Sequence, residues 1–412
     1  YFKIISDSLA FELTNAQKRV VKEIHTDMKK NVSMNRLLQG DVGSGKTIVS
    51  ILSSALAVGN NVQVAVMAPT EILATQHYES FKIELSKARI TCCLLTGKMK
   101  KKERNEIINN IKVAKISVVI GTHAIIQDDV IFKNLGLVII DEQHRFGVTQ
   151  RNKLTKKGMN PHLLSMTATP IPRTLSITYM GDMDLSIIDE LPKNRLPIRT
   201  KVIQSSRIRK VYTFINEQVE LGLQCMIVYP LVEESEKSDI AAAVEMYKEL
   251  KQNVFSGLSI EVIHGKMAPT EKKVIMEGFE NNKINILVAT TVIEVGIDVP
   301  NATTMLVEHA ERFGLTQLHQ LRGRVGRGVE KSYCILVDRG GNEKSSYRLG
   351  IMEKTIDGFK IADEDLILRG PGDYSGLQQS GFIKYKIADM ISDGPIIRKA
   401  RKLAHEIVYN DP

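Results

Sequence analysis

Short apolar runs alternate with longer stretches of helical periodicity along most of this 412-residue chain. In the first half, the runs that predict buried strands lie at residues 61–70, 91–96, 116–123, 137–140 and 162–165. The segments with helical periodicity lie at residues 20–28, 48–58 and 74–86. Strands that alternate with helices at this spacing are typical of a mostly parallel sheet with helices on both faces. Such sheets bind their ligands at the carboxyl ends of the strands.

A polar stretch bracketed by prolines at residues 191–197 interrupts this alternation and is the best candidate for a linker. Beyond it, strands are expected at residues 201–203, 224–229, 260–264, 284–289, 304–307 and 333–337. Helices are expected between them, at about residues 207–221, 239–252 and 270–281. We therefore predict an α/β fold with two tandem parallel-sheet domains, at residues 1–193 and 194–340.

Residues 40–47 match the phosphate-binding loop pattern G-x-x-x-x-G-K-[ST], directly ahead of an expected helix. Glycine at positions 43 and 45 lets the backbone approach a phosphate, because glycine tolerates a positive φ. Lys46 is expected to reach the β- and γ-phosphates of a nucleotide, and the Thr47 hydroxyl to bind Mg²⁺. The candidate nucleotide-binding residues of this loop are Gly40, Gly43, Ser44, Gly45, Lys46 and Thr47.

Two acidic residues, Asp141 and Glu142, directly follow the apolar run at residues 137–140. A carboxylate at the end of such a strand is expected to hold Mg²⁺, usually through water, and we assign this role to Asp141. Glu142 is expected to orient or deprotonate the attacking water. His144 either contacts the nucleotide, links it to the second domain or is a plain structural histidine.

Gln17 is a candidate for recognising adenine. It ends the pattern F-x-L-T-x-x-Q at residues 11–17, in which Thr14 or Asn15 is the expected N-cap of a helix. A carboxamide both donates and accepts hydrogen bonds, as recognition of the adenine edge requires. The pattern is weak by itself and gains weight from the phosphate loop that follows it.

Arg324 and Arg327 in the second domain are three residues apart and are expected on one face of a helical turn. The glycines around them have the order G-x-x-G-x-G, which is wrong for a dinucleotide-binding fingerprint. We expect both guanidinium groups to reach a γ-phosphate across the cleft between the domains, which accelerates hydrolysis by about 10³–10⁵-fold. Surface arginines in a polar helix are the alternative.

The composition is that of an ordinary globular protein, and it changes this picture little. The net charge of +9 favours a polyanionic partner without proving one, and the basic run at residues 98–104 is either a phosphate contact or a solvated helix face. The four cysteines lack metal-binding spacing, and no apolar run approaches the ~18 residues of a membrane span. Aromatic residues make up 5% with no Trp, which argues against a base-stacking platform.

Together these motifs resemble those of superfamily 2 helicases and translocases, in which two RecA-like domains hydrolyse ATP in the cleft between them. The corresponding positions are Gln17 and residues 40–47, 141–144, 166–170, 289–300 and 317–328. The resemblance implies ATP and Mg²⁺ as cofactors. It also implies that Gly296 and Asp298 belong to the nucleotide-binding set and that Lys46, Asp141, Glu142, Arg324 and Arg327 are catalytic.

The C-terminal part is similar to the translocation motif shared by two bacterial DNA motors, the RecG family and the transcription-repair coupling factor. The similar stretches are residues 348–352, 362–373 and 378–381. Ser44, Gln143 and residues 369–373 favour the RecG family. The resemblance implies a third domain at residues 341–412, a helical hairpin with a C-terminal extension. It implies that Arg348, Arg369 and Gln379 couple ATP turnover to stepping on double-stranded DNA.

The resemblance therefore implies an ATP-dependent translocase that remodels branched DNA, such as stalled replication forks and Holliday junctions, in recombination and repair. It implies a monomer in the bacterial cytoplasm, at the nucleoid, with single-stranded DNA-binding protein as a partner at forks and no membrane partner. The chain begins with Tyr1. We therefore expect a fragment without the N-terminal wedge domain of RecG proteins, which binds ATP but does not unwind forks.

Other functions remain open. A translocase like the coupling factor would need an RNA polymerase-binding module, and the residues named above speak against it. A nucleic-acid clamp without DNA-stimulated ATPase is the alternative of a different class. An RNA helicase fits the core alone and is disfavoured by the C-terminal hairpin. A small-molecule kinase explains the phosphate loop but neither the second domain nor its arginine pair.

Overall fold

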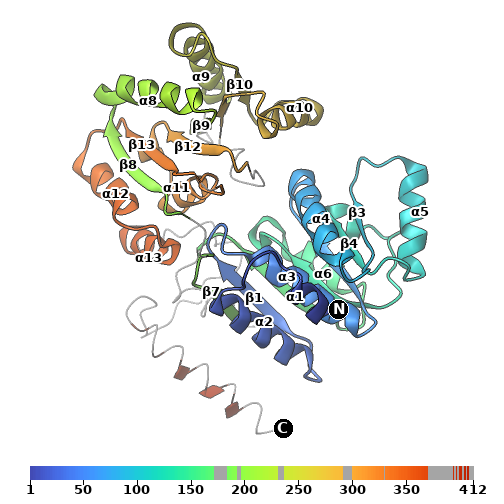
Figure 1. Cartoon of the computed structure of the whole chain (residues 1–412). Coiled ribbons are helices and arrows are strands. Elements are labelled where there is room, and N and C mark those ends of the chain that lie inside the picture. The colour runs from blue at the N-terminus through green and yellow to red at the C-terminus, as the bar shows by residue number, and fades with distance from the viewer. Residues whose placement is uncertain are drawn as a thin grey trace. The chain divides into compact units, whose positions relative to one another are not determined.

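The computed structural model describes residues 1–170, 183–192, 196–230, 236–290, 299–328 and 330–369, together with a few positions after residue 392. Two compact units make up the chain (Figure 1). Unit 1 comprises Tyr1–Pro192 and Leu366–Pro412, and unit 2 comprises Lys193–Asp365. Among the described residues, no helix is long and apolar enough to cross a membrane.

The sheet of unit 1 is parallel, with seven strands among the described residues in the order β3-β4-β2-β5-β6-β1-β7. The strands are β1 Asn35–Gly40, β2 Gln63–Met67, β3 Cys92–Leu95, β4 Val118–Gly121, β5 Leu135–Ile140, β6 His162–Thr167 and β7 Asp184–Ile188. The predicted parallel α/β architecture is confirmed for this unit. The expected strands at 61–70, 91–96, 116–123, 137–140 and 162–165 correspond to β2 to β6.

Helices cover both faces of this sheet (Figure 1). They are α1 Phe2–Asp7, α2 Asn15–Met28, α3 Lys46–Gly59, α4 Glu71–Ser86, α5 Lys101–Lys112 and α6 Val148–Thr155, with short 3-10 turns η1 His123–Ile126 and η2 Gln143–Arg145. Alternate residues of β2 point to opposite faces: Val64 and Val66 join the core beneath α1 to α4, while Ala65 and Met67 join the core beneath α5 and α6. Each face therefore has its own apolar core.

The register of the sheet brings three loops together at its carboxyl edge. Met67 pairs with Ile140, Ile140 with Ser165, and Gln39 with Thr167, so β2, β5, β6 and β1 end at neighbouring positions. The loops that follow β1, β5 and β6 hold the phosphate-binding pattern, the acidic pair and residues 168–170. The topology thus juxtaposes segments that are far apart in the sequence, as expected for a parallel sheet.

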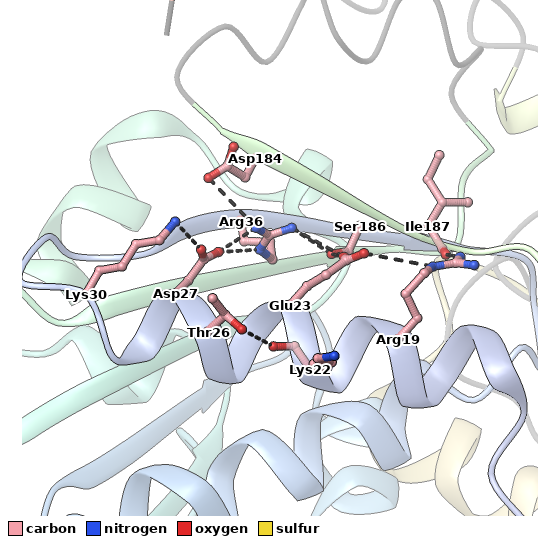
Figure 2. Close-up of polar contacts among 10 residues, drawn as sticks. All are labelled: Arg19, Lys22, Glu23, Thr26, Asp27, Lys30, Arg36, Asp184, Ser186 and Ile187. Carbon is pink, nitrogen blue, oxygen red and sulfur yellow. Dashed lines mark hydrogen bonds and ion pairs between the residues drawn. The ribbon is translucent and has the colours of Figure 1, made fainter. Parts of the chain in front are cut away.

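A buried ion-pair network fixes α2 against β1 and β7 (Figure 2). The Arg36 guanidinium on β1 donates from Nε to Asp27 Oδ2 at 2.7 Å and from Nη1 to the Ser186 hydroxyl on β7 at 2.8 Å. Arg36 Nη1 also lies 3.5 Å from Glu23 Oε2, and Lys30 Nζ donates to the other oxygen of Asp27 at 2.8 Å. Arg36 and Asp27 are buried, so this contact replaces water around both charges.

Replacing Arg36 with Leu is expected to lower the free energy of unfolding of unit 1 by up to about 3–5 kcal/mol, because the buried Asp27 carboxylate would keep only the exposed Lys30 as a partner. The double variant with Asp27→Leu is expected to recover most of this loss. Urea unfolding followed by circular dichroism measures both. Arg19→Leu on the same helix is the control, because Arg19 pairs with Asp189 on an exposed surface and should contribute at most about 1 kcal/mol. Equal losses for the two single variants would contradict the prediction.

Unit 2 holds a second parallel sheet, with six strands among the described residues in the order β10-β11-β9-β12-β13-β8. The strands are β8 Arg199–Gln204, β9 Gln224–Val228, β10 Ile260–Ile263, β11 Ile286–Ala289, β12 Ala302–Val307 and β13 Tyr333–Asp338. The helices are α8 Ile208–Glu220, α9 Glu236–Glu249, α10 Pro269–Glu280, α11 Leu315–Arg322, α12 Glu343–Lys354 and α13 Gly358–Arg369, with the short turns η3 Ser205–Arg207, η5 Leu250–Val254 (a π-helix) and η7 Ala310–Arg312. The predicted second domain of the same architecture is confirmed, and α12 with most of α13 belongs to unit 2. A separate domain at residues 341–412 stays a prediction.

Candidate functional site

The phosphate loop has the backbone conformation that its glycines predict. Gly43 has a φ of 76°, and Gly45, the N-cap of α3, has a φ of 86°. A Cβ added at Gly45 would lie 2.3 Å from the Gln17 Nε2 atom, so a side chain would be both strained and too close. The expected helix at residues 48–58 is confirmed as α3, which begins at Lys46 directly behind this turn.

Lys46 and Thr47 occupy the first turn of α3, where backbone amides face an anion. The Lys46 ammonium donates to the carbonyl oxygens of Gly40 at 2.8 Å and Asp41 at 2.9 Å, so it lies over the loop. Ser44 is buried beside it, and its amide donates to the Asp41 carbonyl at 3.1 Å. This geometry is compatible with phosphate binding, but the individual roles of these residues stay predictions.

Gln17 connects helix α2 to the phosphate loop. Its Nε2 donates to the Ser44 carbonyl at 2.8 Å, and its Oε1 accepts from the Thr14 amide at 2.9 Å. Thr14 is the N-cap of α2, and its hydroxyl accepts from the Gln17 amide at 3.2 Å, which completes a capping box. Of the two expected caps, Thr14 or Asn15, Thr14 is confirmed, whereas this contact of Gln17 with the phosphate loop was not predicted. A carboxamide has a second N–H and a second lone pair, so these contacts are compatible with adenine recognition by Gln17. That role stays a prediction.

Asp141 lies directly after β5 and is held on three sides. Its backbone amide donates to the Met67 carbonyl at 2.9 Å, and its Oδ1 accepts from the Glu142 amide at 3.0 Å. Its Oδ2 lies 2.7 Å from Nε2 of His77, a buried residue of α4. Burial raises the pKa of Asp141, but the hydrogen bond and charge of His77, the Lys46 ammonium and the Glu142 amide together lower it below its usual value. Asp141 is therefore a carboxylate at neutral pH.

Glu142 adopts a left-handed conformation with a φ of 48°. Its Oε2 accepts from the Ala168 amide at 3.4 Å and lies 3.6 Å from His144 Nδ1. Burial and the nearby Arg145 charge lower the pKa of His144 to about 4, so its ring is neutral near pH 7. Glu142 thus joins the loop after β5 to the loop after β6, a link between the candidate motifs at 141–144 and 166–170.

The donor set at this edge fits Mg²⁺. Asp141 supplies an ionised carboxylate and Thr47 a hydroxyl, which are the hard oxygen ligands that Mg²⁺ prefers. The charge of Lys46 at the start of α3 also contributes to lowering the pKa of Asp141. Within the described residues, no three His, Cys, Asp or Glu side chains form a group that could hold a metal ion. A Mg²⁺ here would therefore take most of its ligands from water and phosphate, as is usual for nucleotide sites.

The prediction that Arg324 and Arg327 share one face of a helical turn is wrong. Helix α11 ends at Arg322, and Gly326 has a φ of 76°, which turns the chain between the two arginines. Arg324 is buried in the turn after the helix, with its amide donating to the Leu321 carbonyl at 2.9 Å. Arg327 is half-buried beyond Gly326. Their proposed catalytic role is not tested by this local geometry.

Arg322, which the sequence analysis did not single out, is among the largest fully buried side chains. Its Nη1 donates to the carbonyl oxygens of Met352 at 2.9 Å and Thr355 at 3.0 Å, at the end of α12. Its Nη2 lies 2.8 Å from Nδ1 of His319 on α11. The Arg322 guanidinium therefore links the end of α11 to the end of α12. Arg348, which also lies on α12, donates to the Glu311 carbonyl.

Several predicted site residues lie outside the described residues. Gly296, Asp298 and Gln379 are among them. Arg369 is the last residue of α13, and its side chain is not described. The roles of these four residues stay predictions.

The basic run at residues 98–104 forms the loop after β3 and the start of α5. Lys98 pairs with Glu71 at the start of α4 at 2.9 Å, and Arg104 contacts Asp129 in an exposed ion pair. The loop therefore lies at the carboxyl edge of the sheet, beside the first turn of α4. Lysines that remain at the surface here keep the phosphate contact a reasonable prediction, which the structure does not test.

Three family models match the chain in succession. DEAD/DEAH box helicase matches residues 14–177, Helicase conserved C-terminal domain matches residues 206–329, and ATP-dependent DNA helicase RecG, domain 3, C-terminal, matches residues 355–412. A solved structure of S. cerevisiae Dbp5 bound to RNA shares the fold at a TM-score of 0.61 and 16% identity, over 97% of this chain and 96% of that one. The two domains are thus of the RecA-like helicase type.

Curated relatives cover nearly all of the chain. The ATP-dependent DNA helicase RecG of Aquifex aeolicus is 51% identical over 98% of this chain, and that of Synechocystis is 49% identical over 99%. The chain spans about half the length of these relatives, 52% and 49% respectively. A solved structure of RecG bound to a three-way DNA junction superposes with a TM-score of 0.81 at 45% identity, over 96% of this chain and 51% of that one. The chain belongs to the RecG family of ATP-dependent DNA helicases.

Proposed function

We propose that this chain is the ATP-driven motor of a protein that remodels branched DNA, such as stalled replication forks and Holliday junctions. The observation that carries the proposal is the convergence of the phosphate loop, Asp141 and Glu142 at one edge of a parallel sheet, within a chain related to RecG over nearly its whole length. The RecG structure bound to a three-way junction supports branched DNA as the substrate. Recombination and repair are the processes that use such an activity.

ATP would bind with its phosphates against residues 40–47, where the Gly45 turn exposes backbone amides and Lys46 neutralises charge. Thr47 and Asp141 would hold Mg²⁺, which when bound neutralises phosphate charge and orients the phosphoryl group. Glu142, whose carboxylate lies beside the Ala168 amide, would accept a proton from the attacking water. On the family resemblance alone, we also propose that Arg324 and Arg327 are catalytic and that Gly296 and Asp298 contribute to nucleotide binding.

Motion along DNA would depend on elements outside the phosphate loop. We assign coupling to Arg348, Arg369 and Gln379, and phosphate contacts to the basic run at residues 98–104. Such side chains bind the DNA phosphate backbone rather than base edges. The affinity for DNA should therefore fall steeply as the salt concentration rises and depend little on the DNA sequence. On the family resemblance alone, we also propose a monomer in the cytoplasm, at the nucleoid, with single-stranded DNA-binding protein as a partner at forks.

The test is displacement of a triplex-forming third strand from duplex DNA, which reports movement along the duplex without strand separation. Displacement that requires ATP and is lost in Asp141→Asn would support the motor. DNA binding without displacement, under conditions where ATP is hydrolysed, would instead favour a clamp. Displacement of RNA strands with no response to duplex DNA would favour an RNA helicase.

A further inference from the structure

A histidine of α4 is buried against the candidate magnesium ligand. His77 Nε2 lies 2.7 Å from Asp141 Oδ2, with only 4% and 7% of the two residues exposed. His77 belongs to the face of α4 that packs on the sheet, the same face as Ala74, Phe81 and Leu85. The Phe81 ring meets the imidazole edge-on, with ring centroids 6.4 Å apart and planes at 89°, and so restricts its orientation.

The hydrogen bond has a defined direction. In the function proposed above, Asp141 binds Mg²⁺ as a carboxylate, and its Oδ2 lies 2.7 Å from His77 Nε2. A carboxylate can only accept, so the hydrogen between the two groups must lie on His77 Nε2. His77 therefore acts as a fixed donor to one oxygen of Asp141.

An apolar residue would satisfy the packing at this position, because the neighbouring residues on this face of α4 are apolar or small. A polar ring buried here carries a desolvation cost that its hydrogen bond to Asp141 offsets. The contact also fixes the rotation of the carboxylate. The Glu142 amide holds Oδ1, His77 holds Oδ2, and the lone pairs that remain on both oxygens can face a metal-bound water.

We propose that His77 is a positioning residue for ATP hydrolysis, which orients the Asp141 carboxylate for Mg²⁺ and thereby couples α4 to the metal site. The proposal rests on the function proposed above, in which Asp141 holds Mg²⁺. Residues that orient a metal ligand typically contribute about 10–100-fold to metal affinity. His77 should therefore affect the response to Mg²⁺ far more than the affinity for the nucleotide itself.

The experiment compares His77→Leu, His77→Gln and His77→Asn. Glutamine can place its amide nitrogen near the position of Nε2, whereas asparagine is too short to reach Asp141 Oδ2, so the two amides differ mainly in the donated hydrogen bond. The readouts are the Mg²⁺ concentration for half-maximal thermal stabilisation by a non-hydrolysable ATP analogue, the same quantity for ATP hydrolysis, and the affinity for the analogue in EDTA. Leu85→Ala, a change farther along the same buried face, controls for loss of packing.

We expect His77→Leu and His77→Asn to raise the half-maximal Mg²⁺ concentration about tenfold in both assays, with nearly unchanged affinity in EDTA. His77→Gln should recover most of this loss, and Leu85→Ala should lower stability without changing the Mg²⁺ response. If His77→Leu does not fold, the half-maximal Mg²⁺ concentrations of His77→Gln and His77→Asn are compared with each other to test the proposal. A half-maximal Mg²⁺ concentration that is equal for Gln, Asn and wild type would overturn the proposal.

Asp141→Asn separates this inference from the function on which it rests. If that variant loses the Mg²⁺ response while the His77 variants keep it, only the positioning role fails. If Asp141→Asn keeps the wild-type response, Asp141 is not the metal ligand, and both the proposed site and the role of His77 are overturned.

Discussion

Arg327→Ala is expected to slow ATP hydrolysis by about 10³–10⁵-fold while changing the affinity for ATP only a few-fold. The reason is that a guanidinium directed at the γ-phosphate stabilises charge that develops only in the transition state. Arg327 follows Gly326, which has a positive φ. The Arg327 Nε atom donates to the Gly323 carbonyl oxygen at 3.5 Å. Single-turnover hydrolysis and binding of a fluorescent ATP analogue measure the two quantities separately.

The control for this change is Arg209→Ala, which removes an exposed arginine of α8 in the same unit and should leave both quantities unchanged. Arg327→Lys should not restore the rate, because an ammonium lacks the planar fork of a guanidinium. Equal losses in hydrolysis and in binding would show that Arg327 binds the ground state. A wild-type rate in Arg327→Ala would remove it from the catalytic set.

Lys46→Ala is expected to lower the rate of hydrolysis by at least about 10²–10³-fold, the cost of removing one donor to developing charge in a preorganised site. The Lys46 ammonium donates to the carbonyl oxygens of Gly40 and Asp41 in the phosphate loop. Its charge also contributes to lowering the pKa of Asp141. Its loss would therefore weaken both the proposed phosphate site and the ionised state of Asp141, the proposed metal ligand. Steady-state hydrolysis at saturating ATP and Mg²⁺ measures the effect.

Lys153→Ala on α6 is the matched control, because it removes an exposed lysine of the same unit. It should leave hydrolysis unchanged. A Lys46→Ala variant that retained more than about a tenth of the wild-type rate would be inconsistent with the magnitude expected for such a donor. The phosphate loop would then have to bind its ligand without the lysine.

The strand pattern predicted β2 to β6 and β8 to β13 but neither β1 nor β7. β1 was not predicted, because Asn35, Arg36 and Gln39 interrupt its apolar residues. Arg36 and Gln39 are nevertheless buried, and the Arg36 charge is tolerated because Asp27 on α2 pairs with it. A local pattern contains no information about a partner on another element, so a buried ion pair makes a core strand resemble a surface segment.

Helix boundaries show the same limitation on a smaller scale. α4 was expected from about residue 74 but begins at Glu71, where the Thr70 hydroxyl accepts from the Leu73 amide at 3.3 Å. Thr70 is a favourable capping residue, but it was not used to predict where this helix begins. α5 was not predicted as a helix, because Ile111 is its one buried residue and the rest of the segment is polar or partly exposed.

For the site, loop conformation could be predicted and side-chain partners could not. The positive φ of Gly43 and Gly45 follows from the local pattern, and both are confirmed. The contact of His77 was not predicted because its partner, Asp141, is far away in the sequence. The two residues come together only when β5 pairs with β2, the strand that precedes α4. The signal that could have found it is a histidine within the apolar face of a helix that follows a strand at the ligand-binding edge.

The measurement that tests the central claim most directly is the rate of ATP hydrolysis by this chain, alone and with forked DNA, linear duplex, single-stranded DNA and RNA. It should be made at low and moderate salt, because backbone contacts weaken steeply as salt rises. The account predicts Mg²⁺-dependent hydrolysis that branched or duplex DNA stimulates strongly and RNA does not. Hydrolysis that ignores every nucleic acid at both salt concentrations would contradict the assignment of this chain as a DNA motor.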